Sequence, residues 1–412
     1  MTTAGTPTTA SPPGLARTGG SLWWALGPAV ALVLASLCLR GPFSAVGPVL
    51  GELGDEFSLS TGALAVVTAL PLVCFGLVSP FAPGLAARFG VHRAVVVGMA
   101  VIAAGILLRL GGAPGLFAGT VLLTGGIAIV NVLAPAAARA EYGAKRAAAV
   151  VGLVTAAMAT SASAGAGLAQ PLTSLAGSAR VGLALWLAPV TVALLAVAVL
   201  ARRRRTAPKP ESTAPGSRTA ILRDRVALAV TLYFGIQSLS FYAMLTWLPG
   251  ILQAEAGVSR VGAGALVALA ALLGVPASLV VPTLATRRPS QVGWVVAVSV
   301  PTVVGIAGLL VAPAAAPLLW AVLYGLGTGA AFPLAMTLVL RRTRDVAQTG
   351  RLSASAQSIG YLIAASGPLA VGLLHDATDS WTPALVLLLV AVLAQIAIGI
   401  PAGRAHLVRA DA

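Results

Sequence analysis

The sequence predicts an all-α membrane protein with twelve transmembrane helices in two six-helix halves. Of its 412 residues, 58% are hydrophobic and only 9% are charged, whereas soluble domains carry about 25% charged residues. Twelve apolar windows are each long enough to cross about 30 Å of hydrocarbon. The longest polar interruption, residues 202–225, lies in the middle of the chain and leaves six windows on either side.

The predicted spans follow one another through short loops, so little of the chain remains for a soluble domain. The first half, residues 22–201, holds spans at 23–50, 61–86, 94–110, 114–136, 147–170 and 181–201. The second half, residues 226–401, holds spans at 226–250, 261–286, 291–312, 316–340, 352–374 and 382–401. The composition of residues 202–225, rich in Pro, Ser and charge, is typical of a flexible linker. Residues 1–21 are typical of a disordered tail, and residues 402–412 form a second tail.

Basic residues mark one side of the membrane. Numbered from a cytoplasmic N-terminus, every Lys and Arg except Arg40, Arg109, Arg180 and Arg260 falls in inner loops, the linker or the tails. By the positive-inside rule this predicts a multi-pass protein of the bacterial cytoplasmic membrane, with both termini in the cytoplasm. The net charge of +15 therefore reflects topology. We expect no nucleic-acid partner, because the basic segments carry no interleaved aromatic residues.

Arg40 is the one charged residue deep inside a predicted span. It lies about 4.5 Å from the middle of the first span at 1.5 Å per residue, where an arginine costs about 2.5–3.5 kcal/mol. Two interpretations are open. Arg40 satisfies backbone carbonyls freed by Pro42 and Pro48, which lack an N–H, or it presents a permanent cation to an anionic or polar substrate. Because no Asp, Glu or Lys lies in any span interior, the second interpretation is favoured.

The overall pattern resembles the major facilitator superfamily. The segment P-G-L-A-A-R-F-G-V-H-R at 83–93 is similar to its G-x-L-A-D-R-x-G signature, with Pro83 in place of the leading Gly and Ala87 in place of the Asp. The resemblance implies that Arg88 and Arg93 help to hold the inner faces of the two halves together. It also implies alternating access, in which the two halves rock around a central site.

Stretches inside the spans resemble the cyanate permease and 2-nitroimidazole transporter branch of that superfamily. They are L-C-L-R-G-P-F-S-A-V-G-P at 37–48, N-V-L-A-P at 131–135, F-G-I-Q-S-L-S-F-Y-A-M-L-T-W-L-P at 234–249, G-L-G-T-G-A-A-F-P at 325–333 and S-A-Q-S-I-G-Y-L-I-A-A-S-G-P at 355–368. Cys38 stands where the branch usually has Asn, and Gly41 where it usually has Pro. The resemblance implies a small anionic or polar substrate, similar to cyanate or a nitroimidazole.

Polar and aromatic side chains at helical spacing complete the predicted site. On the seventh span Tyr233 and Gln237 share a face, with the apolar Phe241 one position off it. On the eleventh span Gln357 and Tyr361 share a face in the same way. The predicted substrate-binding residues are Arg40, Asn131, Tyr233, Gln237, Phe241, Gln357 and Tyr361, and the predicted conformational residues are Arg88, Arg93, Pro42 and Pro48. The alternative for each polar residue is hydrogen bonding between helices alone.

The sequence therefore predicts a secondary active transporter that moves a small anionic or polar molecule around Arg40. The alternatives are a non-transporting membrane ligand sensor, a channel, or a multidrug efflux transporter. The short linker and tails disfavour a sensor, the single deep charge disfavours a channel with a repeated lining, and the lack of membrane carboxylates disfavours multidrug efflux. We expect no enzyme activity, cofactor or metal, and a monomer whose partners are the lipid bilayer and its substrate.

Overall fold

The computed structural model describes residues 22–59, 61–203 and 223–409. The predicted tail 1–21, most of the linker 202–225 and residues 410–412 lie outside the described residues. Within the described ranges the regular elements are helices joined by short turns. Twelve of the resulting helical segments are long and apolar enough to cross a membrane. This confirms the predicted fold class and its twelve spans.

The first half contains several interrupted spans. Its elements are α1 (Leu22–Ser36), α2 (Gly41–Ser44), the 3-10 turn η1 (Gly47–Val49), α3 (Leu50–Phe57), α4 (Thr61–Val78), the 3-10 turn η2 (Ser79–Phe81), α5 (Ala82–Phe89), α6 (Val91–Leu108), α7 (Gly112–Ala176), α8 (Ala179–Ala184) and α9 (Leu187–Arg203). The long α7 holds the fourth and fifth spans. They meet at Gly143, whose φ of 66° lies in a region that favours glycine.

The second half has one continuous helix for each span. The helices are α11 (Arg225–Ala256), α12 (Arg260–Ala285), α13 (Val292–Val311), α14 (Pro317–Arg341), α15 (Val346–Thr378) and α16 (Thr382–Gly403). Several begin at a side-chain cap that satisfies free backbone N–H groups. At α11, for example, the Asp224 carboxylate accepts from the backbone N–H groups of Val226 and Ala227 at 2.8 and 3.0 Å.

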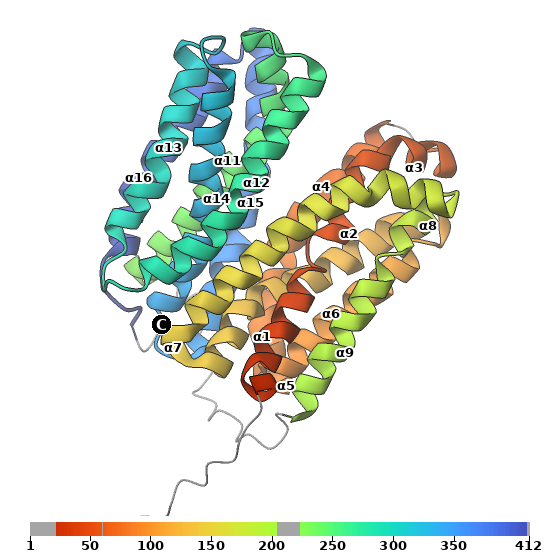
Figure 1. The fold of residues 1–412 in the computed structure, drawn as a ribbon, viewed down its shortest axis with the longest axis vertical. Coiled ribbons are helices and arrows are strands. Elements are labelled where there is room, and N and C mark those ends of the chain that lie inside the picture. The colour runs from red at the N-terminus through yellow and green to blue at the C-terminus, as the bar shows by residue number, and fades with distance from the viewer. Residues whose placement is uncertain (1–21, 60, 204–222, 410–412) are drawn as a thin grey trace, which may run out of the picture.

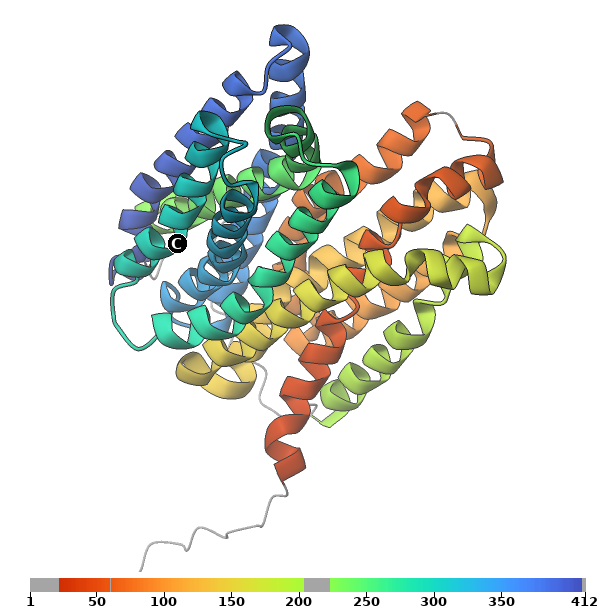
Figure 2. The same ribbon diagram turned by 45° about the horizontal axis from the view of Figure 1, so that its top comes forward.

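The two halves meet at one end of the molecule and diverge toward the other (Figures 1 and 2). Contacts between them run through α4, α5 and α7 of the first half and α12, α14 and α15 of the second. We call the end where the halves meet, near the turn of α7 and the C-terminus, the closed end. The opposite end, where α3 and α8 lie in the first half, is called the splayed end.

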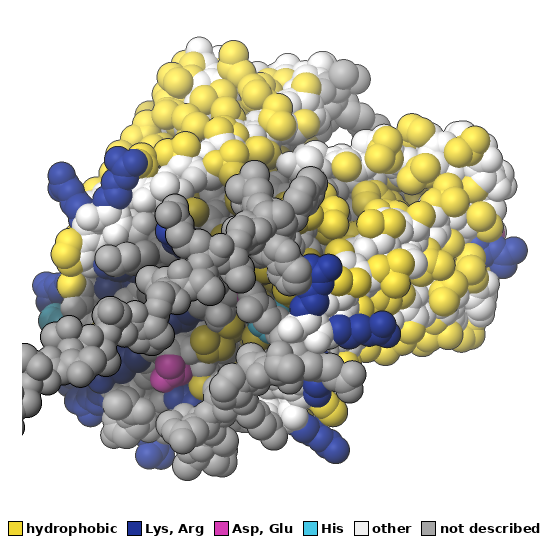
Figure 3. All heavy atoms as spheres, turned by 60° about the horizontal axis from the view of Figure 1, so that its bottom comes forward, with side chains coloured by type: hydrophobic (Ala, Val, Ile, Leu, Met, Phe, Trp, Pro, Cys, Tyr) yellow, Lys and Arg dark blue, Asp and Glu magenta, His cyan; other side chains and the backbone are white. Residues whose placement is uncertain are grey.

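Basic side chains surround the closed end, and hydrophobic side chains cover the adjoining sides (Figure 3). Several arginines of the loops and helix ends that the sequence predicts to be cytoplasmic are exposed. They include Arg88, Arg93, Arg146, Arg202, Arg203, Arg287, Arg288 and Arg344. The polarity of the surface therefore follows the predicted charge asymmetry, with a belt of apolar surface suited to lipid.

The first span is broken at Arg40. We predict a continuous span over 23–50, but α1 ends at Ser36 and α2 begins only at Gly41. Ser161 of α7 bridges the break, because its hydroxyl accepts from Gly41 N–H at 2.8 Å and donates to the Leu37 carbonyl at 2.5 Å. Gly165 allows this close approach, since a Cβ there would lie 2.8 Å from the Gly41 Cα. The break is thus supported by a neighbouring helix, as irregular backbone in a membrane requires.

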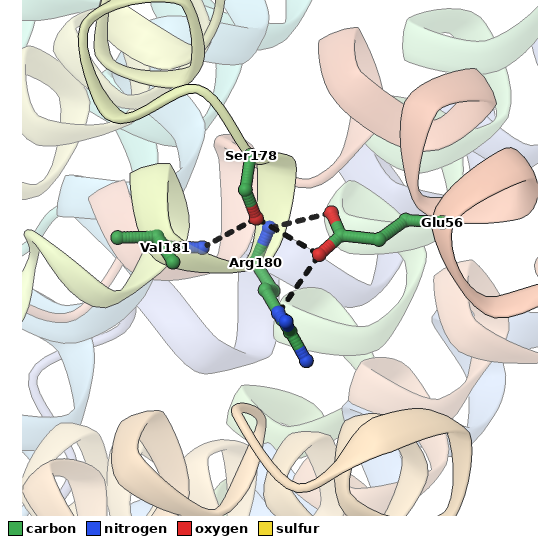
Figure 4. A network of polar contacts seen from close by, with 4 residues as sticks. All are labelled: Glu56, Ser178, Arg180 and Val181. Atoms are coloured by element: carbon green, nitrogen blue, oxygen red, sulfur yellow. Dashed lines mark hydrogen bonds and ion pairs between the residues drawn. The ribbon is translucent and has the colours of Figure 1, made fainter.

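The splayed end of the first half is tied together by Glu56 (Figure 4). The carboxylate of Glu56 on α3 accepts from the Ser178 hydroxyl at 2.8 Å and pairs with Arg180 Nε at 2.8 Å. Ser178 also caps α8 by accepting from Val181 N–H. Because the ion pair is partly exposed, it contributes only about 0–1 kcal/mol to stability. It joins elements of one half only, so it does not restrain the two halves relative to each other.

Candidate functional site

Arg40 reaches from the break in the first span toward the second half. Its Nη1 donates to the Tyr242 hydroxyl of α11 at 2.8 Å. The side chain is partly exposed rather than fully enclosed. Among the residues that the structure describes, Arg40 forms no ion pair with an Asp or Glu. A guanidinium carries five N–H donors, so the single bond to Tyr242 leaves most of its binding capacity available.

The carbonyls of the two prolines in the first span accept from side chains other than Arg40. Arg109, which is 3% exposed, donates from Nη1 to the Pro42 carbonyl at 3.0 Å. Gln170 donates from Nε2 to the Pro48 carbonyl at 2.9 Å. The carbonyls that the two prolines leave without a helical N–H donor are those of Cys38 and Ser44, four residues earlier. Among the described residues, the hydrogen bond of Arg40 goes to the Tyr242 hydroxyl and not to either of these carbonyls.

Three other predicted residues meet across the two halves. Asn131 of α7 donates from Nδ2 to the Tyr361 hydroxyl of α15 at 3.1 Å. Gln357 Nε2 donates to Ser353 Oγ at 2.8 Å and, more weakly, to the Asn131 carbonyl at 3.4 Å. Within the described part of the chain, the buried Gln357 Oε1 has no hydrogen-bond partner. An unsatisfied amide oxygen in a buried site is costly and calls for a donor.

An aromatic cluster links Arg40 to the amides. The ring of Tyr361 lies 5.1 Å from Phe75, 5.3 Å from Phe234 and 6.5 Å from Tyr242, measured between centroids. Phe241 packs edge-on against Tyr242 at 5.2 Å. Phe75 comes from the first half and the other rings from the second. The site thus presents one cation, two amides and apolar aromatic walls.

Tyr233 and Gln237 lie on a different face of α11 from Tyr242. The Tyr233 ring is fully buried against Gly399 of α16, and its hydroxyl faces Gln395 and Ser299 inside the second half. Gln237 is buried and donates to Ser238 Oγ on its own helix at 2.6 Å. The structure does not bring these two residues to Arg40.

The face of α11 that contributes to the aromatic cluster is rotated from the predicted one, at about 100° per residue. It carries Phe234 and Tyr242, which sequence reasoning missed. Helical spacing identifies sets of residues that share a face, but it does not say which face of α11 turns toward Tyr361 and Arg40. Tyr242 was detectable in principle, because a deep cation without a carboxylate needs a hydroxyl or amide partner.

Arg139 forms hydrogen bonds between the two halves at the closed end. Arg88 is exposed with its guanidinium over the Phe89 ring, and Arg93 is exposed. Arg139 donates from Nη1 to the Leu340 carbonyl at 2.8 Å and from Nη2 to the Arg344 carbonyl at 2.6 Å. These carbonyls lie at the end of α14, where backbone acceptors lack helical partners. Nothing in the sequence distinguishes Arg139 from the other inner arginines.

The groups at the central site are suited to binding a ligand. In the described ranges no group of three or more His, Cys, Asp and Glu side chains is placed to hold a metal ion. The two cysteines, Cys38 and Cys74, are buried and unpaired. A fixed cation beside amides and aromatic rings can bind a small planar molecule that carries negative charge or strong acceptors.

The sequence and the fold both match known proteins. A model of the Major Facilitator Superfamily matches residues 32–368. An uncharacterized transporter of Bacillus subtilis, YycB, is 35% identical over 376 residues, covering 90% of this chain and 92% of that protein. The 2-nitroimidazole transporter of Escherichia coli is 34% identical over 376 residues, covering 90% and 94%. The cyanate transport protein CynX of Escherichia coli is 30% identical over 352 residues, covering 85% and 90%.

Solved structures share the fold at low sequence identity. The proton:xylose symporter XylE superposes with a TM-score of 0.75 at 12% identity, covering 93% of this chain and 98% of that one. FucP in its outward conformation superposes with a TM-score of 0.71 at 13% identity, covering 90% and 97%. At such identities the likeness concerns the fold alone.

Proposed function

The chain belongs to the major facilitator superfamily, and from this premise we propose that it is a secondary active transporter with a central site at Arg40. Its relatives are transporters and not enzymes. We propose that the substrate is a small anionic or polar molecule, similar to cyanate or a nitroimidazole. The observation on which this depends most is the deep cation with a single hydroxyl partner.

The charge of Arg40 supports an acceptor-rich substrate. A hydrogen bond to a charged group contributes about 1.5–3 kcal/mol, which is comparable to the cost of placing an arginine at this depth. Cyanate carries one negative charge, and a nitro group presents two oxygens in one plane. The planar fork of a guanidinium matches the two nitro oxygens better than a lysine ammonium does, and its charge also attracts cyanate.

The amides and rings would orient the bound molecule. The free Gln357 Oε1 would accept from a donor on the substrate, and Asn131 and Tyr361 provide further polar groups. Phe75, Phe241 and Tyr242 would cover an aromatic or linear apolar part. Because these residues come from both halves, a bound substrate would contact both, as alternating access requires.

The arrangement of the halves supports a rocking mechanism. Arg139 joins the halves at the closed end, while the same halves diverge at the splayed end (Figure 1). We propose that the basic closed end faces the cytoplasm of a bacterial cell, so that both termini are cytoplasmic and this form faces outward. The opposite form would require the bonds of Arg139 to break. We further propose that the transporter acts as a monomer.

Transport by proteoliposomes containing the purified protein tests this proposal, with cyanate and 2-nitroimidazole as the probes. Arg40→Ala should reduce uptake by about 30-fold or more, because the loss of about 2 kcal/mol or more corresponds to that factor. Arg40→Lys should recover little of it. Arg180→Ala is the matched control, since it removes an arginine of the same half at the splayed end, and it should transport normally.

Several results would contradict the proposal. Normal uptake by Arg40→Ala would remove Arg40 from the site, and failure of the wild type on both probes would contradict the substrate class. Binding without uptake would favour a sensor, and flux that never saturates would favour a channel. Broad acceptance of unrelated drugs would favour multidrug efflux.

A further inference from the structure

A second basic site lies at the closed end, distinct from the Arg40 site. It is a cavity of about 290 Å³ between the two halves. One arginine from the first half and two from the second contribute to its wall. Its lining residues are Arg139, Pro289, Leu340, Arg341, Arg342, Thr343, Ala405 and Leu407. None of them is acidic, so the wall of the cavity carries positive charge and no acidic side chain.

Arg342 is a buried cation whose hydrogen-bond partners are neutral. Its side chain is 2% exposed. Its Nε donates to the Ala402 carbonyl at 2.8 Å, and its Nη2 donates to the Gly403 carbonyl at 2.8 Å and to Gln291 Oε1. Burial and the neighbouring charge of Arg341 lower the pKa of Arg342 to about 10. The protein thus holds this charge in place without neutralising it.

The other two arginines add to the uncompensated charge. In the described part of the chain, the buried Arg341 Nε has no hydrogen-bond partner. The bonds of Arg139 go to carbonyl and hydroxyl oxygens. Asp345 is close enough to attract Arg139, but its carboxylate accepts from Gln348 N–H at 2.7 Å and does not line the cavity. An added anion would relieve the mutual repulsion of the three guanidinium groups.

The segment after α16 forms part of the wall of this cavity. Ala405 and Leu407 line it, and Val408 N–H donates to the Arg342 carbonyl at 2.9 Å. Arg409 N–H donates to Asp224 Oδ2 at 3.1 Å, which fixes the segment against the start of α11. The cavity is therefore formed by both halves and the C-terminal segment together.

We propose that this cavity binds a phosphate-type oxyanion, either free phosphate or the headgroup of an anionic lipid. Guanidinium groups match the geometry of phosphate oxygens, and basic pockets between transmembrane helices suit anionic headgroups. Because Arg139 comes from one half and Arg341 and Arg342 from the other, the bound anion would also strengthen the closed end. This last consequence rests on the proposed alternating-access function, whereas binding itself does not.

Thermal unfolding of the full-length protein tests the binding. In one arm, inorganic phosphate is added to protein in a neutral detergent, against chloride at matched ionic strength. In the other arm, the protein is compared in nanodiscs of phosphatidylglycerol and of phosphatidylcholine. We expect the anion to raise Tm by about 3 °C or more once it exceeds its Kd many times over.

Variants at the end of α14 test whether the rise in Tm comes from anion binding in this cavity. Arg341→Ala should abolish the rise in Tm, because Arg341 lines the cavity. Arg344→Ala is the matched control, since it removes an exposed arginine three residues away that does not line the cavity, and it should respond as the wild type does. Arg341→Gln serves as a second variant if Arg341→Ala does not purify as a folded protein.

Each outcome bears on the proposal. A response to phosphate that depends on Arg341 supports a free oxyanion, and a response to phosphatidylglycerol alone that depends on Arg341 supports a lipid headgroup. No response in either arm, or equal responses in the Arg341 and Arg344 variants, would overturn the proposal. Neither of these results would affect the Arg40 site, because that site is tested with different ligands and a different variant.

Discussion

Arg40 and Arg139 both extend from the first half to the second, but the protein treats their charges differently. Arg40 donates to one hydroxyl, that of Tyr242. Arg139 donates to the Leu340 and Arg344 carbonyls and to the Thr343 hydroxyl. The closed end therefore satisfies its arginine with protein groups, whereas the centre leaves most donors of its arginine unused. The comparison suggests that Arg139 holds the halves together and that Arg40 binds a ligand.

The local backbone explains this difference. Arg139 meets the end of a helix, where carbonyl groups lack partners and the helix dipole favours a cation. Arg40 lies at a helix break that Ser161 bridges by bonds to Gly41 N–H and to the Leu37 carbonyl, and Arg109 bonds the nearby Pro42 carbonyl. A cation at a helix end can therefore donate to backbone carbonyls that lack helical partners. At the break in the first span, Arg40 donates to a side-chain hydroxyl.

The largest expected effect in this comparison comes from Arg139→Ala. Loss of this side chain should shift the equilibrium between the form in which this end is closed and the form in which it is open. We expect a shift of about tenfold to a hundredfold toward the open form, because hydrogen bonds to a charged group contribute about 1.5–3 kcal/mol. Spin labels at the exposed positions 146 and 288 would report this as a broader and longer distance distribution between the halves. Arg93→Ala is the control, and it should match the wild type. Equal effects of the two variants would instead support the predicted role of the loop at 83–93.

A smaller effect is expected from Tyr242→Phe. The change removes the hydroxyl to which Arg40 donates among the described residues, so ligand affinity should fall by about tenfold. Tyr233→Phe is the matched control, because its hydroxyl faces the interior of the second half, and its affinity should stay within about twofold of the wild type. Titration calorimetry with a ligand that the wild type binds measures the affinity of each variant. A larger loss in Tyr233→Phe than in Tyr242→Phe would show that the predicted face of α11 lines the site.

The smallest effect is expected from Gln357→Met. If the free Oε1 accepts from the substrate, affinity should fall by about fivefold, which corresponds to about 1 kcal/mol. Gln395→Met removes a buried amide that is bonded to Ser299 within the second half, and it should leave affinity within about twofold. Unchanged affinity in Gln357→Met, combined with a higher Tm, would identify Gln357 as a packing residue only.

Much of the fold was predictable from the sequence, because lipid imposes span length and apolar composition directly. The twelve spans match, and Arg40 stands out as a deep charge. The extension of the first span to Phe57 was missed, since the polar residues of α3 lie beyond the apolar window. The hydrogen-bond partners of Arg40 and Arg139 were not predictable. The partner of Arg40 depends on how α11 is rotated about its own axis, and those of Arg139 depend on where α14 ends. The spacing of residues along the sequence determines neither.

Ligand binding by wild type and Arg40→Ala tests the central claim most directly. Purified protein would be screened by thermal unfolding against small anions and nitro- or azole-containing heterocycles, and each stabilising compound would then be titrated by calorimetry. We predict that at least one compound binds the wild type and that Arg40→Ala binds it about 30-fold or more weakly. Equal affinity in the two proteins would contradict the assignment of Arg40 as the substrate-binding cation.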